Sequence, residues 1–275
     1  MELIVFDLDG TLLNGKGKIS PLTRVTLAEL SRLGIAYTVA TGRTLHASRQ
    51  LLSAHRFGLP QIYKNGVMIW DPAAEKVLDE NYLQPDEVTH VLDAITSVGL
   101  AAFVFTVEQD SRHMAFHTPP VTAIEKNLVK HLGEREALYV EDMSALPEAA
   151  NITNISVLGE AEVVQRVRSL IEGERHLVAY SGNAWDGDSW KWLDIHHAAA
   201  SKGGAIEVLR QQIEISRVVC FGDSENDLSM FERADESYAP ANADAHIREA
   251  ATSVIGRHDE DGIARFLRER FSLNG

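Results

Sequence analysis

The sequence has little of what cross-links a chain, spans a membrane or attracts nucleic acid. Its one cysteine, Cys220 in the apolar stretch VVCF, excludes an internal disulfide and fits a buried thiol in a reducing compartment. No apolar run approaches the roughly 20 residues of a membrane-spanning helix. Lys and Arg number 26 against 40 Asp and Glu, and the resulting net charge of −14 argues against nucleic acid or an anionic membrane as a partner.

The amino terminus shows no pattern typical of an export signal. Met1 leads directly into a strand-like segment with an acidic residue, and no basic stretch comes first. We therefore expect a cytoplasmic protein. With 45% hydrophobic residues among 275, the chain can bury the core of one large domain or of two smaller ones.

Strand-like and helix-like segments alternate at both ends of the chain. The amino-terminal part predicts strands and helices in turn at 4–6, 21–34, 35–41, 44–57 and 59–66. The alternation returns after His197, with a helix at 201–213 and a strand at 217–221. Such alternation is typical of a parallel sheet with helices on its faces.

The middle of the chain has a different order of predicted strands and helices. From about Val67 a hairpin pattern begins, and strands and helices no longer alternate one for one. This indicates an α+β insert. The predicted fold is α/β, with a doubly wound, Rossmann-like parallel-sheet core at residues 1–82 and 189–275 and an inserted α+β cap domain at 83–188.

Two carboxylates follow the first apolar run in an unusual way. Asp7 and Asp9 come directly after Ile4, Val5 and Phe6, with only Leu8 between them. Near an apolar core each charge costs several kcal/mol unless it is paired or metal-bound. Parallel sheets bind ligands beyond the carboxyl ends of their strands, which is where Asp7 is expected.

Other polar residues follow other predicted strand ends. In VATGR, Thr41 offers a hydroxyl, and the Gly42 amide is expected to open a helix suited to anions. Lys202 begins a further predicted helix. Asp223, Asn226 and Asp227 lie in CFGDSENDLSM. Carboxylates, a lysine, a hydroxyl and an amide together suit a phosphate and a hard cation such as Mg²⁺. One aspartate could attack phosphorus and a second could move protons.

Four of these segments, in this order, resemble the four motifs of the haloacid dehalogenase-like superfamily: DLDGTLL, TGR, the Lys202 segment and GDSEND. The insert lies between the second and third motifs, as in the Cof-type, type IIB branch. The segments NADAHIREAA and DEDGIARFL also resemble that branch's carboxyl-terminal pattern. One departure is APANA at 239–243, where relatives often have glycine before Asn242.

The resemblance implies a role for each motif residue. Asp7 would be the nucleophile that forms an aspartyl-phosphate, and Asp9 would be the general acid and base. Asp227 would orient Lys202 or the metal shell. Mg²⁺ would be held by Asp7, the backbone carbonyl of Asp9 and Asp223, and phosphate by the Leu8 and Gly42 amides, Thr41, Lys202 and Asn226.

The expected activity is therefore a Mg²⁺-dependent phosphomonoesterase acting on a small phosphorylated metabolite, either a sugar phosphate or a phosphorylated cofactor. The core motifs equally fit a phosphomutase of the phosphomannomutase type, because a substrate hydroxyl can replace water. A catalytically silent phosphate-binding protein is a third reading, against which the intact Asp7 and Asp9 argue. Substrate choice is assigned to the insert, with His117, Trp185 and Asp188 as candidate selecting residues.

Overall fold

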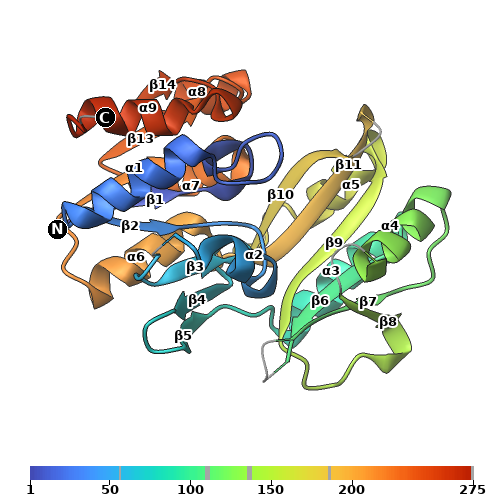
Figure 1. The fold of residues 1–275 in the computed structure, drawn as a ribbon. Coiled ribbons are helices and arrows are strands. Elements are labelled where there is room, and N and C mark those ends of the chain that lie inside the picture. Colours follow the sequence, from blue (N-terminus) through green and yellow to red (C-terminus); the bar gives the residue numbers. More distant parts are fainter. Residues whose placement is uncertain (56, 109–111, 135–137, 185–186, 274–275) are drawn as a thin grey trace. The chain divides into compact units, whose positions relative to one another are not determined.

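The computed structural model describes the chain apart from residues 56, 109–111, 135–137, 185–186 and 274–275 and the side chains of 187 and 188. The chain forms two compact units (Figure 1). Unit 1 comprises Met1–Glu80 and Ser201–Gly275, and unit 2 comprises Asn81–Ala200. Unit 2 extends beyond the 83–188 expected for the insert, because strand β11 (Gly187–His197) stays in the second sheet through its last residue.

A five-stranded parallel sheet forms the centre of unit 1, as predicted. Its strand order is β14-β13-β12-β1-β2. Phe6 at the end of β1 is in register with both Val39 and Phe221, so these three strands end at the same level. The strands are β1 (Glu2–Phe6), β2 (Ala36–Val39), β12 (Arg217–Phe221), β13 (Glu236–Pro240) and β14 (Ser253–Ile255).

Helices cover both faces of this sheet. Alternate residues of the central strands belong to different clusters, and Leu3, Val5 and Cys220 pack with α6, α7 and α8. Phe221 instead contacts Phe266 of α9, which packs against α1. The helices are α1 (Pro21–Arg32), α2 (Leu45–Leu52), α6 (Lys202–Gln212), α7 (Leu228–Phe231), α8 (Ala245–Ala250) and α9 (Gly262–Arg270).

Helix α2 is shorter than the helix predicted at 44–57. It begins after Thr44, whose side chain accepts a hydrogen bond from the Ala47 amide, and it ends at Leu52. The chain then turns and places the Phe57 ring edge-on against Tyr37, with ring centroids 5.1 Å apart. Burial of this aromatic ring against the core is an interaction that helical periodicity alone does not reveal.

A small antiparallel sheet extends the core of unit 1. It contains β3 (Gln61–Tyr63), β4 (Met68–Asp71) and β5 (Lys76–Glu80). Strand β3 also makes one parallel bridge, from Ile62 to Ala40, beside the end of β2. The turn after β3 therefore lies next to the end of the parallel sheet.

Unit 2 is an α+β unit with a six-stranded sheet of order β10-β11-β9-β6-β7-β8. Val104 and Phe116 pack with α3 and α5, whereas Phe103 and Ala115 pack with Leu132 of α4, so both faces of the sheet carry helices. The strands are β6 (Phe103–Val107), β7 (His113–His117), β8 (Tyr139–Asp142), β9 (Ile152–Glu160), β10 (Leu177–Ala184) and β11, and the helices are α3 (Pro85–Ser97), α4 (Ala123–Glu134) and α5 (Ala161–Ile171).

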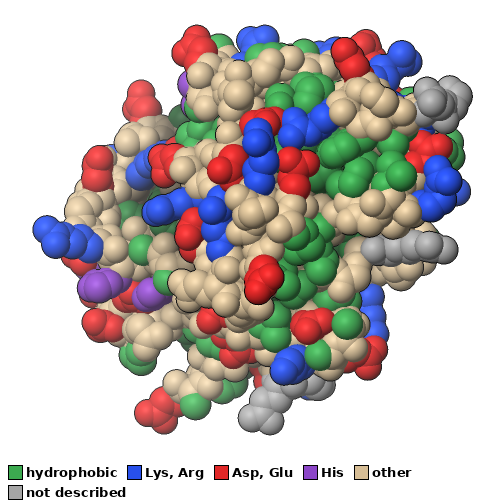
Figure 2. Space-filling view, turned by 90° about the vertical axis from the view of Figure 1, so that its left-hand side faces the viewer, with side chains coloured by type: hydrophobic (Ala, Val, Ile, Leu, Met, Phe, Trp, Pro, Cys, Tyr) green, Lys and Arg blue, Asp and Glu red, His purple; other side chains and the backbone are tan. Residues whose placement is uncertain are grey.

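Among the described residues, no helix is both long and apolar enough to cross a bilayer. Acidic and basic side chains are interspersed on the face shown in Figure 2.

Candidate active site

Asp7 lies where the central strand β1 ends. Its backbone amide donates to the Phe221 carbonyl at 2.9 Å, which continues the pairing of β1 with β12 by one residue. The loop then turns at Gly10, whose φ is +73°. A Cβ atom at Gly10 would lie 2.3 Å from an Asp223 carboxylate oxygen, so only glycine lets this loop pass over Asp223.

Lys202, the first residue of α6, is completely buried between two carboxylates. Its Nζ lies 2.7 Å from Asp7 Oδ1 and 2.6 Å from Asp227 Oδ1. Ser201 caps the helix by accepting a hydrogen bond from the Gly204 amide, which fixes where Lys202 begins. Burial opposes the lysine charge, but Asp227 and Asp7 outweigh it and hold the Lys202 pKa above its usual range.

Asp7, Asp223 and Asp227 form an acid cluster in which each offers one oxygen within 4.8 Å of the others. Burial, then the neighbouring carboxylates Asp227 and Asp223, raise the pKa of Asp7 despite Lys202. Burial and Asp227 raise the pKa of Asp223 to about 6. Such crowding of buried carboxylates is what a divalent cation relieves, so the cluster fits a metal ion.

The three acids differ in how many of their carboxylate oxygens already accept hydrogen bonds. Asp227 uses Oδ1 for Lys202 and Oδ2 for the amides of Asp223 and Ser224, at 2.8 and 3.0 Å. Among the described residues, Asp223 accepts one side-chain hydrogen bond, 2.7 Å long, from the Thr11 hydroxyl. Within the described part of the chain, Asp7 Oδ2 accepts none. Asp7 and Asp223 are therefore the acids with oxygens left for a metal or a substrate.

Asp9 points to a different partner. Arg43 donates from Nε to Asp9 Oδ2 at 2.7 Å and from Nη2 to Oδ1 at 2.6 Å. The Asp9 side chain is 59% exposed. This two-pronged pair places Asp9 outside the acid cluster while keeping it on the same loop.

Thr41 and Gly42 follow β2, but not in the way the sequence suggested. Thr41 is buried, and its hydroxyl accepts a hydrogen bond from the Arg43 amide at 3.1 Å. The Gly42 amide was expected to open a helix. Instead, α2 begins at Leu45 with Thr44 as its cap, so Gly42 lies in the preceding loop. The reason is that the Thr44 side chain is the one that satisfies a first-turn amide.

Asn226 is held by Asn65, which lies at the end of the segment predicted as a strand at 59–66 and was not among the predicted site residues. Its Nδ2 donates to Asn65 Oδ1 at 2.9 Å. Asn65 has a left-handed backbone, with φ of 57°, and the following Gly66 lies so close to α6 that a Cβ would be 2.3 Å from the Ser201 carbonyl oxygen. The Asn65 amide also donates to the Thr41 carbonyl at 3.0 Å, so the Asn-Gly pair after β3 joins the second, third and fourth motif segments.

A model of the haloacid dehalogenase-like hydrolases matches residues 4–267 of this chain. The chain belongs to this family. The match includes every motif segment described above and extends through both units.

Relatives of this haloacid dehalogenase-like hydrolase are named as phosphatases. A putative phosphatase of Mycoplasma pneumoniae is 28% identical over 97% of this chain and 96% of its own length. Pyridoxal phosphate phosphatase of Escherichia coli is 27% identical, with 97% of each chain covered. A haloacid dehalogenase-like hydrolase from Bacillus subtilis shares the fold, with a TM-score of 0.79 at 23% identity over 98% of this chain and 99% of its own. The predicted enzyme class, a phosphomonoesterase, is confirmed.

The candidate selecting residues of this hydrolase lie in unit 2. His117 ends β7, is half-buried, and has its ring centroid 6.2 Å from that of Phe103. Trp185 lies outside the described residues. Asp188 belongs to β11, but its side chain is also outside the described part.

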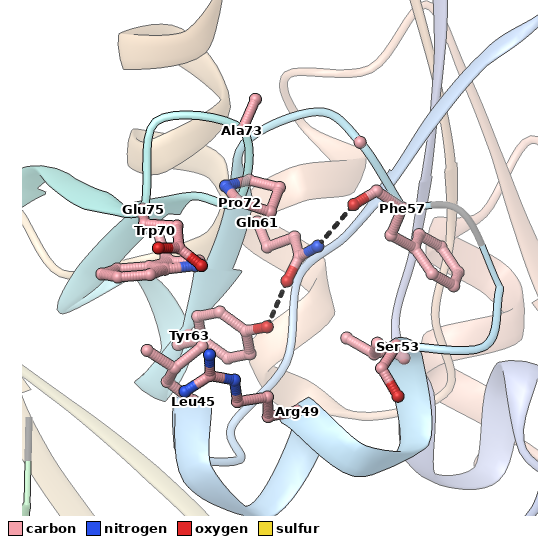
Figure 3. A pocket seen from close by; sticks show the side chains of 12 residues that line it. Leu45, Arg49, Ser53, Phe57, Gln61, Tyr63, Trp70, Pro72, Ala73 and Glu75 are labelled. Atoms are coloured by element: carbon pink, nitrogen blue, oxygen red, sulfur yellow. Dashed lines mark hydrogen bonds between the residues drawn. The ribbon is translucent and has the colours of Figure 1, made fainter.

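Unit 1 also contains a pocket of about 430 Å³ between α2 and the small antiparallel sheet (Figure 3). Arg49 and Glu75 bring charges to its wall, and Trp70 brings apolar surface. The Tyr63 hydroxyl donates to Gln61, and burial raises the pKa of Tyr63. The described lining residues are all different from those of the acid cluster, so the pocket is a separate feature.

Proposed function

We propose that this hydrolase is a Mg²⁺-dependent phosphatase that releases phosphate from a small phosphorylated metabolite through an aspartyl-phosphate. The observation that carries the proposal is the buried Lys202 between Asp7 and Asp227. A lysine in this position holds one Asp7 oxygen in place and supplies positive charge where a phosphate would approach. The same acids without a lysine would repel the substrate.

Asp7 is the proposed nucleophile. Lys202 fixes Oδ1 and leaves Oδ2 to attack phosphorus, which forms an acyl phosphate and breaks the ester P–O bond. In the second step a water molecule attacks that phosphorus, and the bond to Oδ2 breaks. The products are the free alcohol, inorganic phosphate and the regenerated Asp7 carboxylate.

Asp9 is the proposed proton carrier. It would give its proton to the leaving alkoxide in the first step and take one from water in the second. Arg43 occupies both Asp9 oxygens, so this role requires the pair to open during the cycle. The exposure of Asp9 supports such an opening, because 59% of its side-chain surface already faces solvent.

Mg²⁺ is the proposed cofactor, held by Asp7, the Asp9 carbonyl and Asp223. When bound, it would supply positive charge that offsets the phosphate and the crowded carboxylates. Oxygen donors alone at this site are the set that Mg²⁺ prefers. The Leu8 and Gly42 amides, Thr41, Lys202 and Asn226 are proposed to hold the phosphate oxygens.

Unit 2 is proposed to choose the substrate, because the residues of unit 1 just described address only phosphate and metal. His117, Trp185 and Asp188 are the proposed selecting residues. Substitution of each should change the ranking of substrates by kcat/KM but leave p-nitrophenyl phosphate hydrolysis within about tenfold. An unchanged ranking in all three variants would contradict this assignment.

The test is phosphate release from a panel of sugar phosphates and phosphorylated cofactors, with and without Mg²⁺. Pyridoxal phosphate belongs in the panel because it is named for one relative. We expect Mg²⁺-dependent release from at least one compound, abolished by Asp7→Asn. Transfer of the phosphoryl group to a sugar hydroxyl without phosphate release would instead indicate a phosphomutase.

A further inference from the structure

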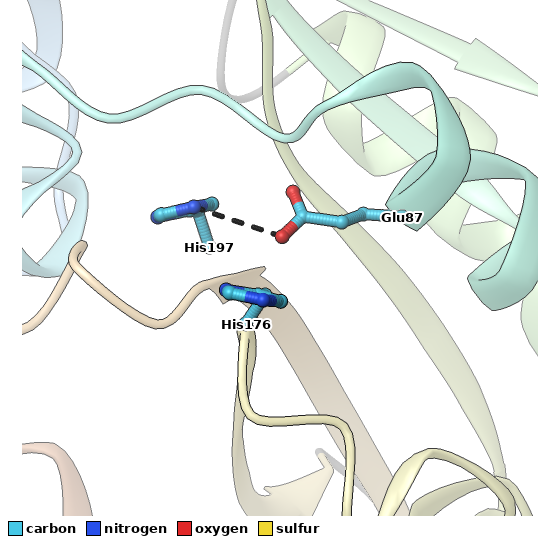
Figure 4. Close-up of side chains that lie close together, drawn as sticks. All are labelled: Glu87, His176 and His197. Carbon is cyan, nitrogen blue, oxygen red and sulfur yellow. Dashed lines mark ion pairs between the residues drawn. The ribbon is translucent and has the colours of Figure 1, made fainter.

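A second group of metal-ligating side chains lies in unit 2. Glu87, His176 and His197 each offer one ligand atom, and these atoms all lie within 4.8 Å of one another (Figure 4). Glu87 is in the first turn of α3, His176 directly precedes β10, and His197 is the last residue of β11. Three segments that are distant in sequence thus bring two imidazoles and one carboxylate together.

Glu87 is the fixed member of this group, which we call the Glu87 site. Its side chain is only 8% exposed. Oε2 accepts a hydrogen bond from the Gln84 amide at 2.7 Å as part of the capping box of α3. This leaves Oε1 directed toward His197 Nε2, at 3.6 Å. A carboxylate oriented by its own helix cap is a preorganised ligand.

The spacing suits a tetrahedral ion. Zn²⁺ bonds of about 2.1 Å place neighbouring ligand atoms roughly 3.4 Å apart. The separation of 3.6 Å between Glu87 and His197 is already close to this value. His176 is exposed, so its ring is free to rotate and shorten the remaining distances. A water molecule would complete the four ligands.

An ion pair between Glu87 and a protonated His197 is the simpler alternative. The neighbouring His90 and Glu174 form a simple pair of this kind. It joins α3 to the turn before β10, with 3.9 Å between His90 Nε2 and Glu174 Oε1. Both of those side chains are about half exposed. The Glu87 site differs because its carboxylate is buried and a second imidazole is present, which a simple ion pair does not require.

We propose that Glu87, His176 and His197 bind Zn²⁺. Two imidazole nitrogens and one carboxylate favour a borderline transition ion over Mg²⁺ or Ca²⁺, which prefer oxygen ligands. The site is therefore chemically distinct from the acid cluster of unit 1, which offers carboxylates alone.

Binding has a specific consequence for His197. Its Nδ1 accepts a hydrogen bond of 3.2 Å from the Ala199 amide, which places the ring proton on Nε2. A metal at Nε2 moves that proton to Nδ1 and breaks this bond. Ala199 lies in the segment by which the chain leaves unit 2, and Gln84 lies in the segment by which it enters. Through its ligands Glu87 and His197, Zn²⁺ would instead join the helix that follows the entering segment to the strand that precedes the leaving one.

The test is a Zn²⁺ titration of the full chain in millimolar Mg²⁺, which keeps the acid cluster occupied, with a chromophoric chelator as competitor. We expect one tight Zn²⁺ per chain. His176→Asn, His197→Asn and Glu87→Gln should each weaken binding by at least about tenfold. Glu87→Gln keeps an acceptor for the helix cap. His246→Asn, at an exposed position of α8, should bind as the parent does.

A parent protein that binds no Zn²⁺ under these conditions, or three variants with parental affinity, would overturn the proposal. Nuclear magnetic resonance of the parent protein tests the proposal even if a variant fails to fold, because it needs no substitution. Zn²⁺ should shift the ring signals of His176 and His197 and the amide signal of Ala199. Shifts at other residues in place of these would equally overturn it.

Discussion

Arg43 holds both carboxylate oxygens of Asp9, at 2.7 Å from Nε and 2.6 Å from Nη2. Both side chains are partly exposed, and exposed ion pairs contribute about 0–1 kcal/mol to the free energy of unfolding. Stability therefore gives little reason for the pair. Its position suggests instead that Arg43 holds the proposed proton carrier in a defined orientation between turnovers.

Arg43→Lys removes the two-pronged geometry but keeps the charge. We expect kcat to fall by about tenfold with a smaller change in KM, because a single ammonium cannot fix both oxygens. Arg43→Ala should show at least the same fall. Thermal unfolding should hardly change in either variant. Steady-state kinetics at several pH values provide the check, and an unchanged kcat would identify the pair as a surface contact only.

Asp7→Asn and Asp9→Asn should fail in different ways. The first removes the attacking oxygen, so turnover should fall to background and no phosphoryl-enzyme should form. The second should lose about 10²- to 10⁴-fold in kcat, which is the usual contribution of proton transfer. Intact mass spectrometry after rapid acid quench should then detect an added phosphoryl group in the Asp9→Asn variant but not in the Asp7→Asn variant. Substantial activity in Asp7→Asn would show that another group attacks phosphorus.

Lys202→Met should destabilise the protein as well as inactivate it. The substitution leaves Asp7 and Asp227 buried without their partner, and breaking a buried ion pair costs about 3–5 kcal/mol. Urea unfolding measures the loss. Lys130→Met is the matched control, because Lys130 is 70% exposed and its Nζ lies 3.9 Å from Glu134 Oε1, an i,i+4 pair on the helix surface. Equal effects in the two variants would contradict the role of Lys202.

Removal of metal should abolish activity, and acid should weaken metal binding. Excess EDTA should stop phosphate release, and Mg²⁺ should restore it. Asp223 has its pKa raised to about 6 in the metal-free protein, by burial and by Asp227, so protons compete with Mg²⁺ below that pH. The apparent Mg²⁺ dissociation constant should therefore rise as the pH falls through 6. A constant affinity across this range would exclude Asp223 as a ligand.

Glu236 should make stability depend on pH in acid. Hydrogen bonds from Arg270, Tyr238 and Arg217 lower its pKa from 4.5 to about 2. A lowered carboxyl pKa stabilises the fold above the unfolded value, and this stabilisation is lost as the pH falls from 4.5 toward 2. Melting temperatures of Glu236→Gln and the parent should differ at neutral pH and converge in acid. The exposed Glu249→Gln should match the parent at every pH.

The sequence predicted the parts of the site that depend on strand order. Asp7, Asp223 and Asp227 meet because β1 and β12 are parallel neighbours, and alternating segments already imply such a sheet. Lys202 was likewise placed at the start of its helix. These features follow from local patterns combined with one general rule about parallel sheets.

Other features depend on contacts that no local pattern contains. Asn65 lies at the end of the predicted strand segment 59–66, and the Asn-Gly pair there was the available signal for its place beside Asn226. Arg43 pairs with Asp9, from which it is separated by 34 positions in the sequence. The Glu87 site depends on the pairing of β10 with β11, which brings His176 beside His197. The register of two antiparallel strands is set by packing, which alternation alone does not specify.

The position of β1 also affects the order in which the protein can fold during synthesis. β1 is synthesised before β2 and β12 but lies between them in the sheet. Lys202, the ion-pair partner of Asp7, follows Asp7 by 195 residues. Unit 2 is continuous in sequence, so it can complete its sheet while one edge of β1 is still unpaired. The nascent chain therefore carries an open apolar strand edge and an uncompensated Asp7 until α6 and β12 emerge.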